Sequence, residues 1–168
     1  MSDRYLYLGL LLSEHLDFSI TAKHVAKSAS RALGLLIAKS KSFGSLSSGT
    51  FTKLFDSVVF PVISYAAAIW GHTQFSCITA VQNRACRFFL GVGRYTPNTA
   101  INGDMGWIPA FTKQWDSVVR HLCRLRNMDD SRLNKKIFNW ADLHKATSKN
   151  WIHKVEGHIH SLGLDNLI

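Results

Sequence analysis

Acidic residues are scarce in this sequence of 168 residues. Eleven aspartates and glutamates stand against twenty lysines and arginines, which gives a formal net charge of +9. This imbalance suits a partner rich in phosphate, although basic composition alone selects no particular partner. Proline is also rare, with three residues, and hydrophobic residues make up 46% of the chain. Together these features favour a globular protein over a disordered one.

The motifs of the common catalytic sites are missing. The sequence contains no nucleophile elbow, no P-loop and no dinucleotide-binding glycine motif. Its three cysteines, Cys77, Cys86 and Cys123, include no CxxC pair and lie in apolar helical patterns. Reduced core thiols are therefore expected, with a zinc site as the minor alternative.

Two clusters near the C-terminus resemble metal-binding patterns only superficially. His153 and His160 share a helical face at about 100° per residue but His158 does not, so exposed histidines are expected rather than a metal site. Asp129 and Asp130 are the only adjacent carboxylates, and a basic helix and the residues SRLNKK flank them. A polymerase metal box would lie between two apolar strands, so we interpret this pair as a linker at a helix end. The sequence predicts no metal site and no cofactor.

The longest apolar pattern runs from Phe51 to Trp70 and predicts a buried helix. Apolar residues follow the i, i+3, i+4, i+7 spacing over five turns. Pro61 removes one backbone donor, so we expect a kink there or two helical segments that meet at Phe60. The uncharged stretch 57–83 has a dense apolar part shorter than the ~20 residues that a membrane span needs. The predicted inward residues are Phe51, Leu54, Phe55, Val58, Val59, Val62, Ile63, Ala66, Ala67 and Trp70.

The segments on either side of this helix predict one strand and several more helices. Residues 5–12 are predicted to form one short, buried strand, because the apolar run is too short for a helix. Thr21 is expected to cap a helix that ends near Lys39, and Ser48 or Thr50 is expected to cap the central helix. In the helix 74–90, Gln82, Arg84 and Arg87 are expected to point away from the core. The other predicted helices cover residues 99–106, 111–128, 133–140 and 148–162. The predicted fold is all-α, a helical bundle preceded by one orphan β-strand.

Basic residues recur on three of the predicted helices and in one loop. Lys23, Lys27 and Arg31 repeat every four residues on one helical face. Cations on several helices, with aromatic side chains in the intervening loops, suit a grip on a phosphate backbone with some base stacking. A solvated helical face is the alternative for each cluster. The candidate nucleic-acid-binding residues are Lys23, Lys27, Arg31, Arg84, Arg87, Arg94, Tyr95, Arg120 and Arg124.

The order of these segments resembles the C-terminal part of LINE-type (non-long-terminal-repeat) retrotransposon reverse transcriptases. The resemblance covers residues 5–128. Its most telling piece is an aliphatic-Pro-x-x-x-Tyr pattern that ends in Trp, here Pro61, Tyr65 and Trp70. A Gln-x-x-x-x-Arg block follows, and then Gly91 and the loop 94–97. The remaining blocks are YLGLLLSEHLDF, the basic helix after it, and a GWIP element.

The resemblance implies a division of the chain and a role for each part. Residues 1–18 would be a residual palm or primer-grip strand and turn, in which Tyr7-Leu8-Gly9 closes the palm. Residues 19–128 would be a thumb-like helical bundle, and residues 129–168 a helical extension. The family's magnesium-binding aspartates precede the Tyr-Leu-Gly strand. We therefore expect a truncated fragment that binds the backbone of an RNA/DNA duplex and has no catalytic activity of its own.

Other functions and partners stay open at this stage. The face of a thumb that meets the palm would be exposed, so contact with a missing palm domain or self-association is expected. A non-enzymatic protein-interaction module is the first alternative, and a peripheral membrane protein is the second. The N-terminal apolar run meets Ser13, Glu14 and His15 rather than a small-residue cleavage site. We therefore expect an intracellular protein, in the nucleus or cytoplasm, that is not secreted.

Overall fold

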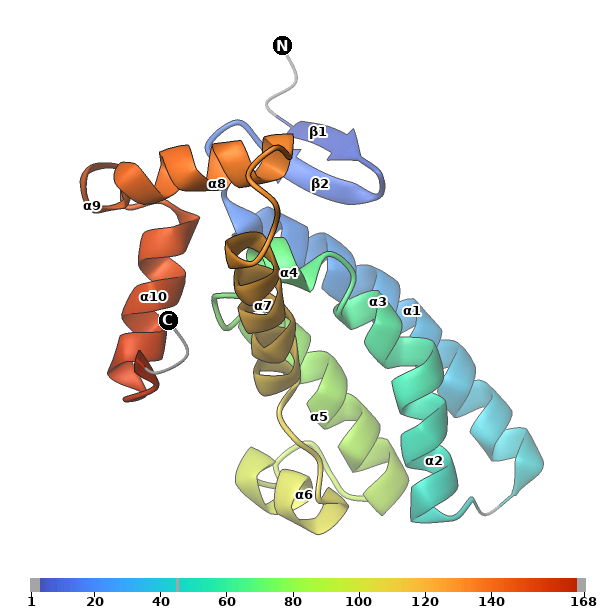
Figure 1. Cartoon of the computed structure of the whole chain (residues 1–168). Helices are drawn as coiled ribbons and strands as arrows, with labels where there is room; N and C mark the ends of the chain where they lie inside the picture. The colour runs from blue at the N-terminus through green and yellow to red at the C-terminus, as the bar shows by residue number, and fades with distance from the viewer. Residues whose placement is uncertain (1–3, 45, 166–168) are drawn as a thin grey trace.

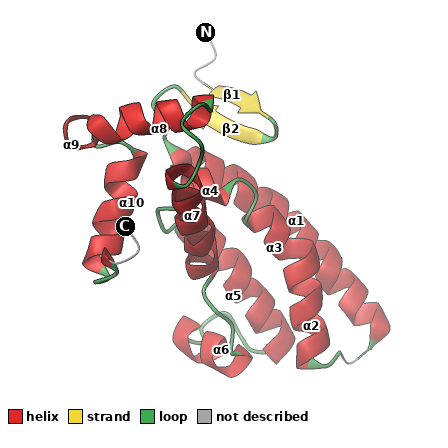
Figure 2. Ribbon diagram, viewed as in Figure 1, coloured by secondary structure: helices red, strands yellow, loops and turns green. Residues whose placement is uncertain are grey.

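The computed structural model describes residues 4–44 and 46–165. This part of the chain is mostly helical and carries a β-hairpin at its N-terminal end (Figures 1 and 2). The ends of the first and last predicted segments, residues 1–3 and 166–168, lie outside the described residues. The helical class is confirmed, whereas the prediction of a single orphan strand is wrong.

The N-terminal apolar run pairs with itself. Strand β1 (Arg4–Tyr7) lies antiparallel to β2 (Leu10–Ser13), and Tyr7 is opposite Leu10. Leu8 and Gly9 form the turn with φ angles of 47° and 83°, a left-handed pair that matches the twist of a tight hairpin. Tyr7-Leu8-Gly9 is therefore a strand end and a turn. The expected burial holds for Leu10 but not for Tyr5, Leu6 and Tyr7 of β1, whose side chains are exposed.

The first helix, α1 (Phe18–Phe43), is longer at both ends than predicted. Asp17 caps it rather than Thr21, because the Asp17 Oδ1 accepts a hydrogen bond from the backbone N–H of Ser19 at 2.9 Å. The Thr21 hydroxyl instead donates to the carbonyl oxygen of Leu11 and fastens the hairpin to the helix. A cap residue and a hairpin anchor look alike in sequence.

The central apolar pattern forms four short helical pieces rather than one helix. They are α2 (Ser48–Leu54), the π-helical turn η1 (Phe55–Val59), α3 (Phe60–Ile63) and α4 (Ala67–Trp70). Ser47 caps α2, not Ser48 or Thr50.

Proline and a change of helical period explain the first break in this pattern. Pro61 cannot donate to the carbonyl of Ser57, and the backbone N–H of Phe60 donates five residues back to Phe55. The segments thus meet at Phe60, as predicted. The wider π turn lets every fourth residue face inward, at Phe51, Phe55, Val59, Ile63 and Ala67, while Val58 is 44% exposed.

A second break at Ala66 was not predicted. Ala66 adopts a left-handed conformation with φ 51°, and the indole N–H of Trp70 donates to the carbonyl of Tyr65 at 2.9 Å. The Tyr65 hydroxyl donates to the carbonyl of Leu8 and joins this bend to the hairpin turn. The bend at Ala66 is thus accompanied by one local hydrogen bond and by one to a distant part of the chain.

Helices α5 (Ser76–Leu90), α6 (Asn98–Met105) and α7 (Ala110–Arg126) follow. Gln82 does not point away from the core as predicted, since only 4% of it is exposed. Its amide donates to the carbonyl of Ile108 at 2.9 Å and accepts from the N–H of Ala110 at 2.6 Å. An α5 side chain thus caps the start of α7.

The C-terminal part contains α8 (Leu133–Leu143), α9 (Lys145–Ser148) and α10 (Trp151–Ser161). Asn150 caps α10 through its contact with the N–H of His153 at 3.2 Å. Helix α10 therefore begins after the predicted start at Ser148, and the helical turn α9 before it was not predicted.

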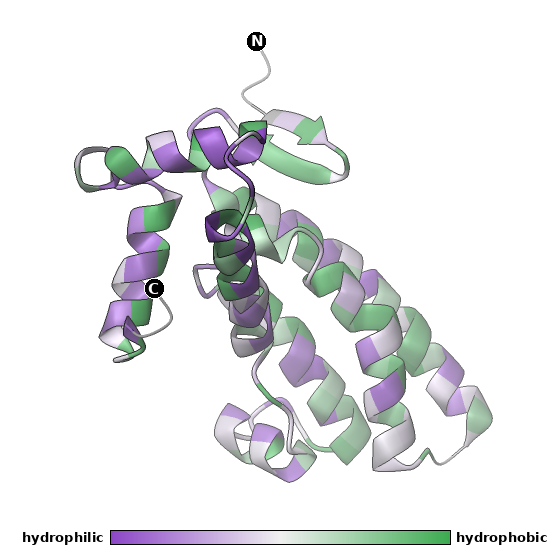
Figure 3. Ribbon diagram, in the orientation of Figure 1, coloured by the Kyte–Doolittle hydropathy of each residue, from purple (hydrophilic) through white to green (hydrophobic). Residues whose placement is uncertain are grey.

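Two hydrophobic cores hold these elements together. The first lies among β2, α1, α2, η1, α3, α4, α5 and α6. In its aromatic centre Phe51 stacks on Phe89 and Phe55 packs at a tilt against Trp107, at centroid distances of 5.0 and 4.5 Å. The second lies among α7, α8 and α10. Helix α7 joins them, because Ala110 belongs to the first core and Leu122 to the second. In Figure 3, hydrophobic colour follows α3 and the lower half of α1.

Within the described residues, no helix combines the length and the apolar character needed to cross a membrane.

Candidate nucleic-acid interface

Lys23, Lys27 and Arg31 form an exposed row on α1, which we call the α1 basic row. Residues four apart in a helix rise about 6 Å, so the row spans about 12 Å. The opposite side of the helix carries fully buried alanines and leucines, among them Ala29 and Leu33. This burial fixes the rotation of α1 and therefore holds the three cations in solvent.

None of the three cations in the α1 basic row makes an ion pair with another described residue. Their neighbours are short and neutral, and one Arg31 Nη2 donates to the Ser28 hydroxyl at 3.2 Å. The Asp17 carboxylate caps the start of α1, and hydrogen bonds from Ser19, with a smaller effect of the Lys23 charge, hold its pKa below the ordinary value. The α1 basic row therefore keeps its charge available for a partner.

The sequence around the α1 basic row explains this lack of acidic partners. Asp56 is the only acidic residue between Phe18 and Gly103, a stretch that holds nine lysines and arginines. The Asp56 carboxylate pairs with the Lys113 ammonium of α7 at 2.9 Å. The single carboxylate between Phe18 and Gly103 is thus directed toward α7.

Helix α5 runs beside α1 in the same direction. The ring of Phe18, at the start of α1, meets His72 just before α5 at a centroid distance of 5.8 Å. Near the other ends, Lys41 and Phe88 line one shallow cavity. Arg84 lies exposed on α5 and, like Lys39 and Lys41 near the end of α1, makes no ion pair with another described residue.

Arg87 occupies a different position from the one expected of a backbone-binding residue. One of its Nη2 hydrogen bonds goes to the carbonyl of Thr96 at 2.9 Å and another to the Asn98 Oδ1 at 2.7 Å. Its Nε is buried without a hydrogen-bond partner in the described chain. Arg87 thus holds the loop between α5 and α6 against α5.

That loop presents Arg94 and Tyr95 to solvent. The Arg94 guanidinium lies over the Tyr95 ring at 4.7 Å from its centroid, and 84% of Tyr95 is exposed. The guanidinium covers one face of the Tyr95 ring, and most of the remaining ring surface is exposed to solvent. Such a pair can stack on a base or on the end of a duplex.

Arg120 and Arg124 are exposed on α7, outside the α1–α5 helix pair. The Arg120 Nε pairs with the Asp116 Oδ2 at 2.8 Å across one helical turn. Helix α7 packs mainly on α4 and α5, and its viewer-facing side in Figure 3 is largely hydrophilic. The nine predicted residues are therefore distributed over α1, α5, the loop between α5 and α6, and α7.

Several of the C-terminal histidines, and Asp129 of the aspartate pair, contact other residues of the chain. The His158 ring packs edge-on against Trp115 at 4.5 Å, and the His160 Nδ1 contacts the Asp165 carboxylate at 2.8 Å. The Asp129 carboxylate, between α7 and α8, accepts from the backbone N–H of Ser131. Hydrogen bonds from the side chain and the backbone of Ser131 lower the pKa of Asp129. No group of three or more histidine, cysteine, aspartate or glutamate side chains in the described chain is arranged to hold a metal ion.

The three cysteines are free thiols, as predicted. Burial raises the pKa of Cys86 to about 11, so its thiol stays protonated near neutral pH. A buried, protonated thiol is a poor nucleophile.

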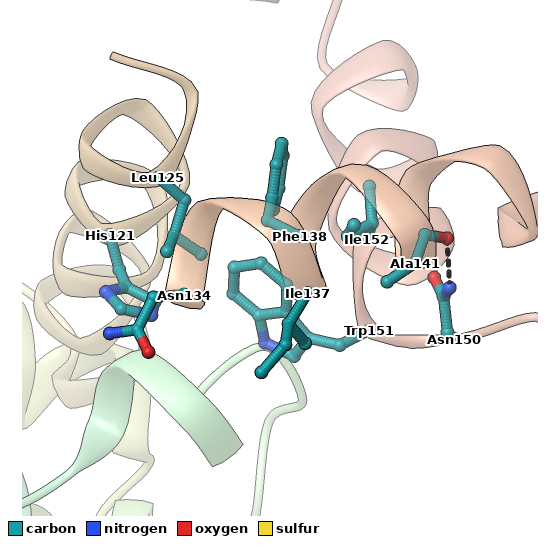
Figure 4. A pocket seen from close by; sticks show the side chains of 9 residues that line it. All are labelled: His121, Leu125, Asn134, Ile137, Phe138, Ala141, Asn150, Trp151 and Ile152. Atoms are coloured by element: carbon teal, nitrogen blue, oxygen red, sulfur yellow. Dashed lines mark hydrogen bonds between the residues drawn. The ribbon is translucent and has the colours of Figure 1, made fainter. Parts of the chain in front are cut away.

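One cavity lies away from the basic residues, between α7, α8 and α10 (Figure 4). It measures about 290 Å³ and is lined mainly by apolar side chains such as Leu125, Phe138 and Ile152. The indole N–H of Trp151 is buried at its wall without a hydrogen-bond partner among the described residues. The cavity holds no cluster of ionisable groups, so it offers no evident chemistry.

Comparisons with protein-family models, curated proteins and solved structures give no match to this chain.

Proposed function

We propose that this chain is a thumb-like helical bundle from a LINE-type reverse transcriptase and that it binds the backbone of an RNA/DNA template-primer duplex. The single observation that carries the proposal is the α1 basic row, three cations held in solvent by the packing of their helix. Phosphate groups recognise such a row by charge, and contacts to phosphate carry no sequence information. The expected binding is therefore independent of sequence.

In this proposal Arg84 of α5 would add a further phosphate contact, and Tyr95 would supply a stacking surface next to Arg94. Arg120 and Arg124 of α7 would make a secondary contact, because Arg120 is already paired with Asp116. In this proposal the chain has no catalytic activity of its own and needs no metal ion, and the parent family's magnesium chemistry would belong to a palm domain. Its place of action would be intracellular, where a template is copied.

The test compares two triple variants that have the same net charge. The first changes Lys23, Lys27 and Arg31 to Gln. The second changes Lys136, Lys149 and Lys154, which are exposed on or near the C-terminal helices, to Gln. Binding to a fluorescent RNA/DNA duplex is measured by anisotropy at about 0.1 M salt, and circular dichroism checks folding.

We expect the first variant to bind about ten- to a hundred-fold more weakly than wild type, because three phosphate contacts are lost. The second variant should retain most of the affinity. Equal losses in the two variants would mean that binding follows net charge rather than this surface. Wild-type protein that is folded and does not bind would refute the proposal.

A further inference from the structure

Helix α8 carries large apolar side chains that are more than half exposed. Leu133, Ile137 and Trp140 are 69, 56 and 64% exposed, and Leu143 is 83% exposed. Successive members are three or four residues apart, so they follow one side of the helix. We call these four residues the α8 stripe. Trp140 stands out because the other four tryptophans are buried or half-buried.

The opposite side of α8 is anchored in the second core. Phe138 is 8% exposed and packs in the cluster that contains Leu122. Asn150 donates to the carbonyl of Ala141 at 2.6 Å, which ties the end of α8 to the start of α10 (Figure 4). Core packing therefore presents the α8 stripe on a helix with a fixed rotation.

We propose that the α8 stripe is a dimer interface, in which two copies of this chain pair their α8 helices antiparallel around a two-fold axis. An axis placed midway between Ile137 and Trp140 sets Ile137 of each copy against Trp140 of the other. A two-fold interface needs a surface that complements itself, and an apolar stripe on one helix meets that requirement.

The charges at the two ends of α8 favour a second copy over an unrelated apolar partner. Asp130 lies just before the start of α8. Lys149 lies beyond the C-terminal end of α8, after the short α9. Both side chains are exposed, and neither makes an ion pair with another described residue. Antiparallel pairing brings Asp130 of each copy toward Lys149 of the other and opposes the two helix dipoles.

The size of the α8 stripe predicts a weak dimer. With about 200 Å² for each large side chain, the four exposed fractions leave roughly 500 Å² of apolar surface per copy. Two copies would bury roughly 1,000 Å², near the lower limit for a specific interface. We expect a dissociation constant of about 10 to 100 µM that persists at high salt, because apolar burial dominates.

The first test is sedimentation velocity of the whole chain from about 1 to about 500 µM. Wild type should shift from monomer to dimer, whereas Trp140→Glu should weaken the dimer at least about ten-fold. Leu35→Glu is the matched control, because Leu35 is 69% exposed on α1 and lies outside the stripe. Circular dichroism confirms that each variant is folded. A monomer at every concentration, or a dimer that Trp140→Glu leaves unchanged, would overturn the proposal.

A charge exchange tests the antiparallel arrangement and needs no change in the apolar residues. Asp130→Lys should weaken the dimer several-fold, because a lysine then faces Lys149 of the other copy. Adding Lys149→Asp to the same chain should restore the affinity. Failure of the double variant to recover would refute the antiparallel pairing. Neither test uses a nucleic acid, so the result is independent of the proposed duplex binding.

Discussion

The two hydrophobic cores of this protein use charged residues differently. Around the first core, the α1 basic row has no described ion-pair partner, and aromatic packing supplies the stability. Beside the smaller second core, Glu156 of α10 accepts from Arg126 at 2.6 Å and from Lys145 at 2.8 Å. Cations near the second core thus hold the fold, whereas those of α1 are available to bind phosphate.

The largest expected effect tests the stability of the first core. Trp70 is fully buried, so Trp70→Ala should lower the free energy of unfolding by about 3 to 5 kcal/mol. Trp140→Ala makes the same chemical change on an exposed helix and should cost less than about 1 kcal/mol. Urea denaturation measures both. Equal losses would show that the first core does not dominate stability.

The second prediction addresses the ion pairs beside the second core. Glu156→Gln removes a carboxylate that is only 16% exposed and that two cations share, and it should cost about 1 to 3 kcal/mol. Asp116→Asn breaks the exposed pair with Arg120 and should change stability by less than about 0.5 kcal/mol. Equal shifts of the urea midpoint in the two variants would contradict this prediction.

The third prediction concerns the basic residues of α7. Changing Arg120 and Arg124 together to Gln should weaken duplex binding by no more than about three-fold, because one of them already has an acidic neighbour. Anisotropy titrations at about 0.1 M salt provide the measurement. A loss as large as that of the α1 triple variant would place the main contact on α7.

The smallest effect is a dependence of stability on pH. Burial lowers the pKa of His72 and of His121 below the ordinary value of about 6.5. The unfolded chain then binds more protons than the folded one as pH falls through 6.5, so stability is full above that value and decreases below it.

Denaturation midpoints from about pH 7.5 to about pH 5.5 should therefore decline. His121→Gln tests how much of this decline comes from the histidine beside the second core. His72→Gln tests how much comes from the histidine beside the first core. A profile that both variants leave unchanged would rule out these histidines as the cause.

Local pattern was sufficient to predict most helices but not their junctions. The stripe of Val25, Ala29 and Leu33 predicted the buried side of α1 because that side has one period along a long helix. Residues 51–70 also predicted a helix, yet the break at Ala66 depends on contacts of Trp70 and Tyr65 that form only in the folded chain. The hairpin had a local signal, Gly9 in an apolar run, which favours a turn at a positive φ.

The candidate site was only partly predictable for a related reason. The four-residue spacing of Lys23, Lys27 and Arg31 predicts their common exposure directly. No spacing rule showed that Arg87 binds the carbonyl of Thr96, because its partner lies in a loop. The burial of Gln82 could have been predicted from the sequence, because Gln82 lies four residues after Ile78 on the apolar side of α5.

The salt dependence of duplex binding is the most direct test of whether the α1 basic row binds phosphate. The affinity of wild type, of the α1 triple variant and of the Lys136, Lys149 and Lys154 triple variant is measured from about 50 to about 300 mM salt. Each lost phosphate contact should reduce the slope of log affinity against log salt by about one. The slope should be reduced by about three for the α1 variant and unchanged for the other. Equal slopes for the two variants would contradict this expectation.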